Sequence, residues 1–111
     1  MKIFINDQGA HNGKDWIKSL NEKDYKKLYR HFLKLESHGQ KILKRQINFP
    51  DIKPLQQTNG LWQIRINQYR ALFFFYDNAN IIVTHGFSKK EDELAPNEIE
   101  IAQNIKNHFQ L

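Results

Sequence analysis

Three segments in the second half of the chain carry the apolar and aromatic side chains of β-strands, partly in alternation with polar ones. They are Leu61–Ile66, Tyr69–Tyr76 and Ile81–Phe87. The joints between them, Asn67-Gln68 and Asp77–Asn80, are rich in residues that favour turns. Strands that follow each other through such short joints predict an antiparallel meander.

A long helix is predicted in the first half of the chain. Apolar side chains recur at helical spacing from Tyr25 to Leu35, and Asn21 is a favourable N-cap in front of them. Gly39 is typical of the residue that follows a last helical turn. We therefore expect a helix over Glu22–His38.

Shorter elements flank these two regions. We expect a strand over Lys2–Asn6, a short helix over Asp15–Leu20, and a connecting segment whose end, Lys53–Leu55, joins the sheet. Pro96 suits the first turn of a final helix. With 111 residues, the chain fits one domain, 1–111. The predicted fold is α+β, with a small, mostly antiparallel meander sheet, N-terminal helices packed on one face and a C-terminal helix.

The short joint at Asn67-Gln68 fixes which residues of the first hairpin face each other. With these two residues as the turn, Arg65 lies directly opposite Arg70. Like charges at such a pair destabilise a sheet. The pair is therefore expected to hold an anion between its guanidinium groups, either an RNA phosphate or an acidic segment of a partner protein.

The same register places apolar residues on one face, which we expect the helices to cover. These residues are Trp62, Ile64, Ile66, Tyr69, Ala71 and Phe73. A second turn at Asn78-Ala79 gives three further pairs: Tyr76 with Ile81, Leu72 with His85, and Arg70 with Phe87. This second register places His85 on the same face of the sheet as Arg65 and Arg70, which we call the arginine face.

The arginine face therefore gathers candidates for chemistry. His85, Gln63 and Phe74 share it, and Lys89 and Lys90 follow the last strand. Phe74 is expected either to border the site or to contact a partner. A histidine at this place could move a proton near neutral pH, or it could be a sheet residue satisfied by a neighbour. The two lysines could bind phosphate, or they could be solvated charges that discourage pairing at the end of a strand.

The net charge of +5 is unevenly distributed. Residues 1–56 contain 12 Lys and Arg against 6 Asp and Glu, whereas residues 57–111 contain 5 against 6. Part of the surplus forms one stripe on the predicted long helix, at Lys23, Lys27, Arg30 and Lys34. The stripe is either a solvated helix face or a surface for RNA phosphates. Lys53 and Gln63 are further RNA-binding candidates.

Several kinds of site are excluded or disfavoured. The chain has no cysteine, so it has no disulfide and no thiolate metal site. Its five glycines form no phosphate-loop motif, and its five histidines show no short metal-ligand spacing. The longest apolar run, Ala71–Tyr76, is far shorter than the roughly 20 residues that span a bilayer. We therefore expect a cytoplasmic protein with no membrane partner.

Several short motifs occur in an order known from one toxin family. They are LESHG at Leu35–Gly39, IKPL at Ile52–Leu55, LWQIR at Leu61–Arg65, YRALFF at Tyr69–Phe74, HGFSKK at His85–Lys90 and EIEIA at Glu98–Ala102. In this order and spacing the chain resembles the RelE/HigB-like toxins of bacterial type II toxin–antitoxin modules, and within them the phage-derived HigB-like branch. The resemblance extends from about Ile17 to Phe109.

The resemblance implies a RelE-like fold and an endoribonuclease that cleaves mRNA, usually on the ribosome, without a metal or other cofactor. Arg65 and Arg70 match the basic residues that such toxins place on the sheet, and Lys89 and Lys90 match a basic position after the last strand. With His85 as a proton-transfer group, these five residues are the catalytic candidates. The implied partner is a neighbouring antitoxin, typically a helix-turn-helix protein.

Two other functions stay open at this point. One is a toxin of the same fold that inhibits DNA gyrase by binding and has no nuclease activity. The other is a basic RNA-binding or phage accessory domain without catalysis.

Overall fold

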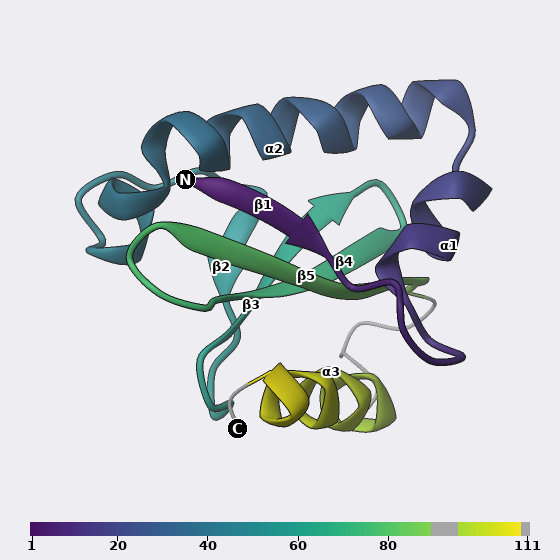
Figure 1. The fold of residues 1–111 in the computed structure, drawn as a ribbon. Helices are drawn as coiled ribbons and strands as arrows, with labels where there is room; N and C mark the ends of the chain where they lie inside the picture. Colours follow the sequence, from purple (N-terminus) through teal and green to yellow (C-terminus); the bar gives the residue numbers. More distant parts are fainter. Residues whose placement is uncertain (90–95, 110–111) are drawn as a thin grey trace.

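The protein folds as a five-stranded sheet between helices (Figure 1). The structure, a computed structural model, describes residues 1–89 and 96–109. Its strands are β1 (Lys2–Ile5), β2 (Ile52–Pro54), β3 (Leu61–Ile66), β4 (Tyr69–Phe75) and β5 (Asn80–Ser88), and its helices are α1 (Gly13–Ser19), α2 (Glu22–Leu43) and α3 (Pro96–Phe109). The predicted α+β class is therefore confirmed, and every predicted element is present.

The strands lie in the order β1-β5-β4-β3-β2. The meander from β2 to β5 is antiparallel, as predicted, whereas β1 joins the sheet parallel to β5. The β3–β4 hairpin has the predicted register, in which Ile66 faces Tyr69 and Arg65 faces Arg70. Asn67 takes a positive φ of 55° in the turn, a conformation that asparagine tolerates better than most residues.

The predicted register of the second hairpin is correct in one half and wrong in the other. Near the turn, Phe75 rather than Tyr76 faces Ile81, because the Asp77 carboxylate accepts hydrogen bonds from the backbone of Ala79 and the amide of Asn80 and holds a longer loop. A β-bulge between Leu72 and Phe73 then shifts the pairing by one residue. Beyond it the predicted pairs are restored: Leu72 with His85, and Arg70 with Phe87.

Helix α2 covers one face of the sheet (Figure 1). Its buried side chains pack on the apolar residues predicted for that face, among them Trp62, Ile64 and Phe73. The helix does not end at His38 as predicted but continues through Gly39 to Leu43. A Cβ on Gly39 would collide with the side chain of Met1, so this glycine makes room for the start of the chain within the helix.

Helix α3 covers the opposite face of the sheet (Figure 1). Ala102 packs there against Leu61, Leu72 and Phe74. Phe74 is fully buried, so the expectation that it borders an open site is wrong. None of the helices within residues 1–89 and 96–109 is long and apolar enough to cross a membrane.

Candidate functional site

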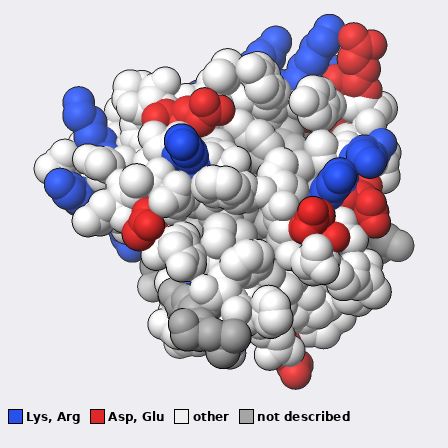
Figure 2. Space-filling model, in the orientation of Figure 1, with Lys and Arg blue, Asp and Glu red and all other residues white. Residues whose placement is uncertain are grey.

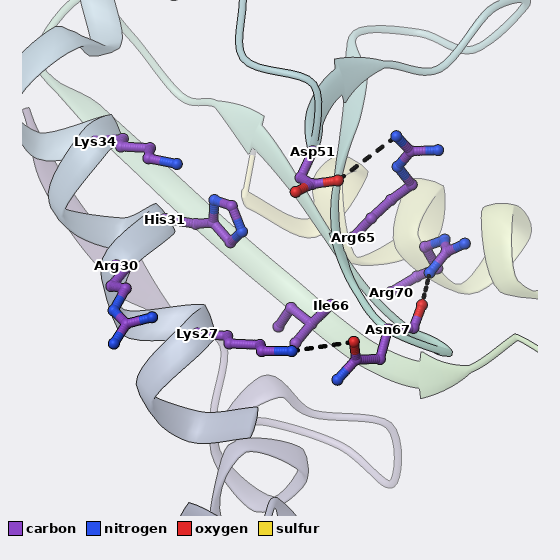
Figure 3. A pocket seen from close by; sticks show the side chains of 9 residues that line it. All are labelled: Lys27, Arg30, His31, Lys34, Asp51, Arg65, Ile66, Asn67 and Arg70. Atoms are coloured by element: carbon purple, nitrogen blue, oxygen red, sulfur yellow. Dashed lines mark hydrogen bonds and ion pairs between the residues drawn. The ribbon is translucent and has the colours of Figure 1, made fainter. Parts of the chain in front are cut away.

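A hollow of about 480 Å³ opens between α2 and the tip of the β3–β4 hairpin (Figure 3). Helix α2 contributes one wall, the loop before β2 contributes Asp51, and the hairpin contributes the other wall. The described residues that line it are Lys27, Arg30, His31, Lys34, Asp51, Arg65, Ile66, Asn67 and Arg70. Five of these nine side chains are permanent cations, and one is a carboxylate. The hollow is therefore suited to an anion.

A pair of side-chain hydrogen bonds holds the hairpin against α2. The Asn67 amide donates to the Asp24 carboxylate at 3.0 Å, and its carbonyl oxygen accepts from the Lys27 ammonium group at 3.2 Å. Asp24 is buried, so it has few other partners to replace this one. The turn that aligns the two arginines therefore also fixes their distance from the basic stripe.

The two arginines are each held to one side by backbone carbonyls. Arg65 donates to the Pro50 carbonyl at 2.9 Å and lies 3.5 Å from the Asp51 carboxylate. Arg70 donates to the carbonyls of Asn67 and Tyr69 at 2.9 and 2.8 Å. These bonds relieve part of the repulsion between the directly opposed guanidinium groups.

The arginine pair nevertheless keeps unused hydrogen-bonding capacity. The Nε atoms of Arg65 and Arg70 are both buried without a partner among the described residues. Burial and the nearby Arg65 lower the pKa of Arg70, and Asp51 opposes this shift. Both guanidinium groups stay charged at neutral pH, so the pair keeps two positive charges that no described carboxylate other than Asp51 offsets.

The helix stripe reaches the hollow only in part. Lys27, Arg30 and Lys34 line it, whereas Lys23 does not. The Lys34 ammonium group lies 5.1 Å from the centre of the Phe49 ring, which holds it beside the loop before β2. The structure thus joins two features that are separated in the sequence, the stripe and the arginine pair.

Two residues of the hollow were missed by the sequence analysis. Asp51 is the carboxylate beside Arg65, and His31 is a side chain of α2 that is 8 % exposed. His31 follows Lys27 by four residues and precedes Lys34 by three, so the helical repeat places it beside the stripe. Burial and, secondarily, Lys34 lower its pKa, while Asp51 raises it.

The sequence of the chain matches one family over most of its length. The match is to the family described as phage derived protein Gp49-like, and it covers residues 15–107. The chain belongs to this Gp49-like family. Members of the family are regarded as RelE-like toxins, so the match supports the toxin superfamily without singling out the HigB-like branch. No curated protein matches the chain.

His85 of this Gp49-like protein lies beneath α3 and not in the hollow. Its pairing with Leu72 is as predicted, but the face that carries it is not open, and the side chain is 2 % exposed. One ring nitrogen lies 2.9 Å from the Glu98 carboxylate and the other 3.1 Å from the Thr84 hydroxyl. Burial lowers its pKa against the opposing effect of Glu98. Of the two alternatives for His85, the structure favours a sheet residue satisfied by its neighbours, since α3 would have to move before a substrate could reach the ring.

The other predicted residues lie outside the lining of the hollow. Lys53 of β2 pairs with Gln63 of β3, which in turn pairs with Leu72 of β4, and neither Lys53 nor Gln63 lines the hollow. The backbone of Lys89 donates to the Gln68 carbonyl at 2.6 Å, which places it beside the hairpin turn. Lys90 lies outside the described residues, as do the acidic residues that follow it.

The surface of the Gp49-like protein is not uniformly basic. On the face shown in Figure 2, Lys and Arg side chains lie interspersed with Asp and Glu side chains. In the part of the chain that the structure describes, no cluster of His, Asp and Glu could hold a metal ion.

Proposed function

We propose that this Gp49-like protein is a cytoplasmic RelE-type toxin that cleaves mRNA, with the basic hollow as its phosphate-binding site. The observation that carries the proposal is the pair formed by Arg65 and Arg70, which face each other at one wall of a hollow whose other wall carries three cations. Directly opposed cations destabilise a sheet. An RNA phosphate bound by both guanidinium groups would compensate this cost.

The proposed reaction is a phosphoryl transfer within the RNA chain. The ribose 2′-oxygen attacks the adjacent phosphorus, and the 5′-oxygen leaves. Negative charge accumulates on the phosphoryl oxygens in the transition state, where fixed cations stabilise it. Arg65 and Arg70 are the proposed cations of this step, and they act without a metal. Lys27, Arg30 and Lys34 hold the neighbouring phosphates in the proposed complex.

The proposal gives the remaining predicted residues lesser roles. Lys89 stands beside the turn that carries the arginines, so it could contact a flanking phosphate. Lys53 and Gln63 lie along the sheet and could contact RNA further from the scissile bond. The proposed partners are the ribosome, which presents the message, and an antitoxin encoded beside the toxin, which is expected to be a helix-turn-helix protein.

A purified translation system tests the proposal. The wild-type protein is expected to cleave ribosome-bound mRNA, and Arg70→Ala is expected to lower the cleavage rate by about 100-fold or more. Lys41→Ala is the matched control, because Lys41 is an exposed cation of α2 outside the hollow, and it is expected to cleave normally. A wild-type protein that leaves mRNA intact but blocks purified DNA gyrase would overturn the proposal.

A further inference from the structure

We propose that His31 is the proton acceptor for the attacking 2′-hydroxyl in the basic hollow. The inference rests on the proposed function and assigns a step that the arginines cannot perform. Guanidinium groups stay protonated at neutral pH, so a cleavage reaction in the hollow requires a different group to take the proton of the nucleophile.

The position of His31 supports this role. Among the described residues that line the hollow, His31 is the one imidazole. In Figure 3 its ring extends from α2 towards Asp51, and the guanidinium groups of Arg65 and Arg70 lie on the far side of the hairpin strands. An RNA segment whose phosphates run from the helix cations to Arg65 would therefore pass beside the ring. By contrast, His85 is enclosed beneath α3 and bonded to Glu98 and Thr84.

The bonding of His31 is incomplete, unlike that of His85. The ring makes no hydrogen bond to any other residue in the part of the chain that the structure describes, and its Nδ1 atom is enclosed without a partner. Buried polar atoms are normally bonded, so an unpartnered imidazole at the wall of a basic hollow indicates a functional role. Because Nδ1 is enclosed, Nε2 is the nitrogen through which a substrate can reach the ring.

The charges around His31 favour an imidazole that is neutral before the reaction. The groups that face it are Lys27, Arg30 and Lys34 from α2, Asp51 from the loop before β2, and Arg65 and Arg70 from the hairpin. Burial and Lys34 keep the pKa below its ordinary value, so the ring is ready to accept a proton at neutral pH. Asp51 opposes that shift and would stabilise the imidazolium ion once it forms.

In the proposed step one proton moves, one bond to phosphorus forms and one breaks. His31 takes the proton of the 2′-hydroxyl as the 2′-oxygen forms a bond to phosphorus. The bond between phosphorus and the 5′-oxygen breaks, and the leaving oxygen takes a proton from water. The products are a 2′,3′-cyclic phosphate and a 5′-hydroxyl end. The imidazolium ion then returns its proton to solvent.

The test compares His31→Gln with His38→Gln in the translation system. His38 is an exposed histidine of the same helix outside the hollow, so its replacement controls for the loss of an imidazole. His31→Gln is expected to lower the single-turnover cleavage rate by about 10²- to 10⁴-fold. It is also expected to abolish the fall in rate at acidic pH that the wild type shows. Affinity for single-stranded RNA is expected to stay within about threefold.

Each other outcome has a definite meaning. Wild-type cleavage with an unchanged rate and pH profile in His31→Gln overturns the role of His31 and leaves the proposed function standing. Absence of cleavage by the wild type overturns both. If His31→Gln does not fold, the wild-type imidazole is followed by NMR during titration with inorganic phosphate. The pKa of His31 is expected to rise when phosphate fills the hollow, and an unchanged pKa overturns the inference.

Discussion

Asn67 at the tip of the β3–β4 hairpin donates a hydrogen bond to the buried carboxylate of Asp24 on α2, at 3.0 Å. The same side chain accepts a hydrogen bond from Lys27. Neither partner is near Asn67 in the sequence. The contact therefore determines how far the arginine pair stands from the helix cations, and with it the width of the hollow.

Replacing Asn67 should lower stability through two separate effects. Asn67→Ala leaves Asp24 without this partner, which costs about 1–3 kcal/mol. It also places a Cβ-bearing residue without a compensating side chain at a φ of 55°, at a cost of about 1 kcal/mol. Asn67→Gly loses the same hydrogen bond, but glycine adopts a positive φ without strain. Urea unfolding is expected to rank the variants as wild type, then glycine, then alanine, and equal losses would contradict the backbone effect.

Removing the acid of the hollow should strengthen anion binding. Asp51→Asn keeps the shape of the side chain but removes the carboxylate beside Arg65. Affinity for a short single-stranded RNA is expected to rise about two- to fivefold at low salt, since exposed charge pairs contribute roughly 0.2–1 kcal/mol. The gain should shrink at 1 M salt, where charges are screened. Asp7→Asn, at an exposed site outside the hollow, is the control that should change little.

Acid should destabilise the protein through its two buried histidines. The pKa values of His31 and His85 are both lowered by burial, so near and below pH 6.5 the unfolded chain binds more protons than the folded one. The free energy of unfolding is therefore expected to fall as pH drops below about 6.5, by up to about 1.4 kcal/mol per pH unit for each histidine. Urea titrations between about pH 7.5 and 5.5 should show a shallower slope for His31→Gln. An unchanged slope would contradict a neutral His31.

A methyl group on Gly86 should displace α1 from the sheet. A Cβ at this position would collide with the indole ring of Trp16, so the ring cannot keep its place. Gly86→Ala is expected to lower the free energy of unfolding by about 1–3 kcal/mol and to alter tryptophan fluorescence. The double variant Gly86→Ala/Trp16→Ala is the control, because with the indole gone the added methyl should cost less. Additive losses would contradict the contact.

Local patterns were enough to predict the hairpin that carries the arginines. A two-residue turn decides the register by itself, and it placed Arg65 opposite Arg70 correctly. The second hairpin depends on Asp77, which holds a longer loop, and on a bulge that compensates for it. The longer loop shifts the register by one residue, and the bulge shifts it back. The pattern of apolar and polar residues in the two strands reveals neither shift, so the sequence did not indicate the different pairing near the turn.

The hollow itself could not be predicted from local sequence patterns. Lys27 and Asn67 are 40 residues apart in the sequence, and their contact depends on how α2 crosses the sheet. The pattern of α2 predicts a basic stripe but not which stripe residues meet the hairpin. Likewise, the pairing of Leu72 with His85 was correct, but the apolar side chains of Leu61, Leu72 and Phe74 on that face were not recognised as the surface that α3 covers.

The parallel pairing of β1 with β5 has a consequence for the way the protein is made. β1 leaves the ribosome early, but its partner residues in β5 are Asn80 to Val83. The strand must therefore wait, unpaired, until most of the chain has been synthesised. Long-range pairing of this kind slows folding. If the protein is the ribosome-dependent toxin proposed above, late completion of the sheet gives a co-translated antitoxin time to engage the chain before it becomes active.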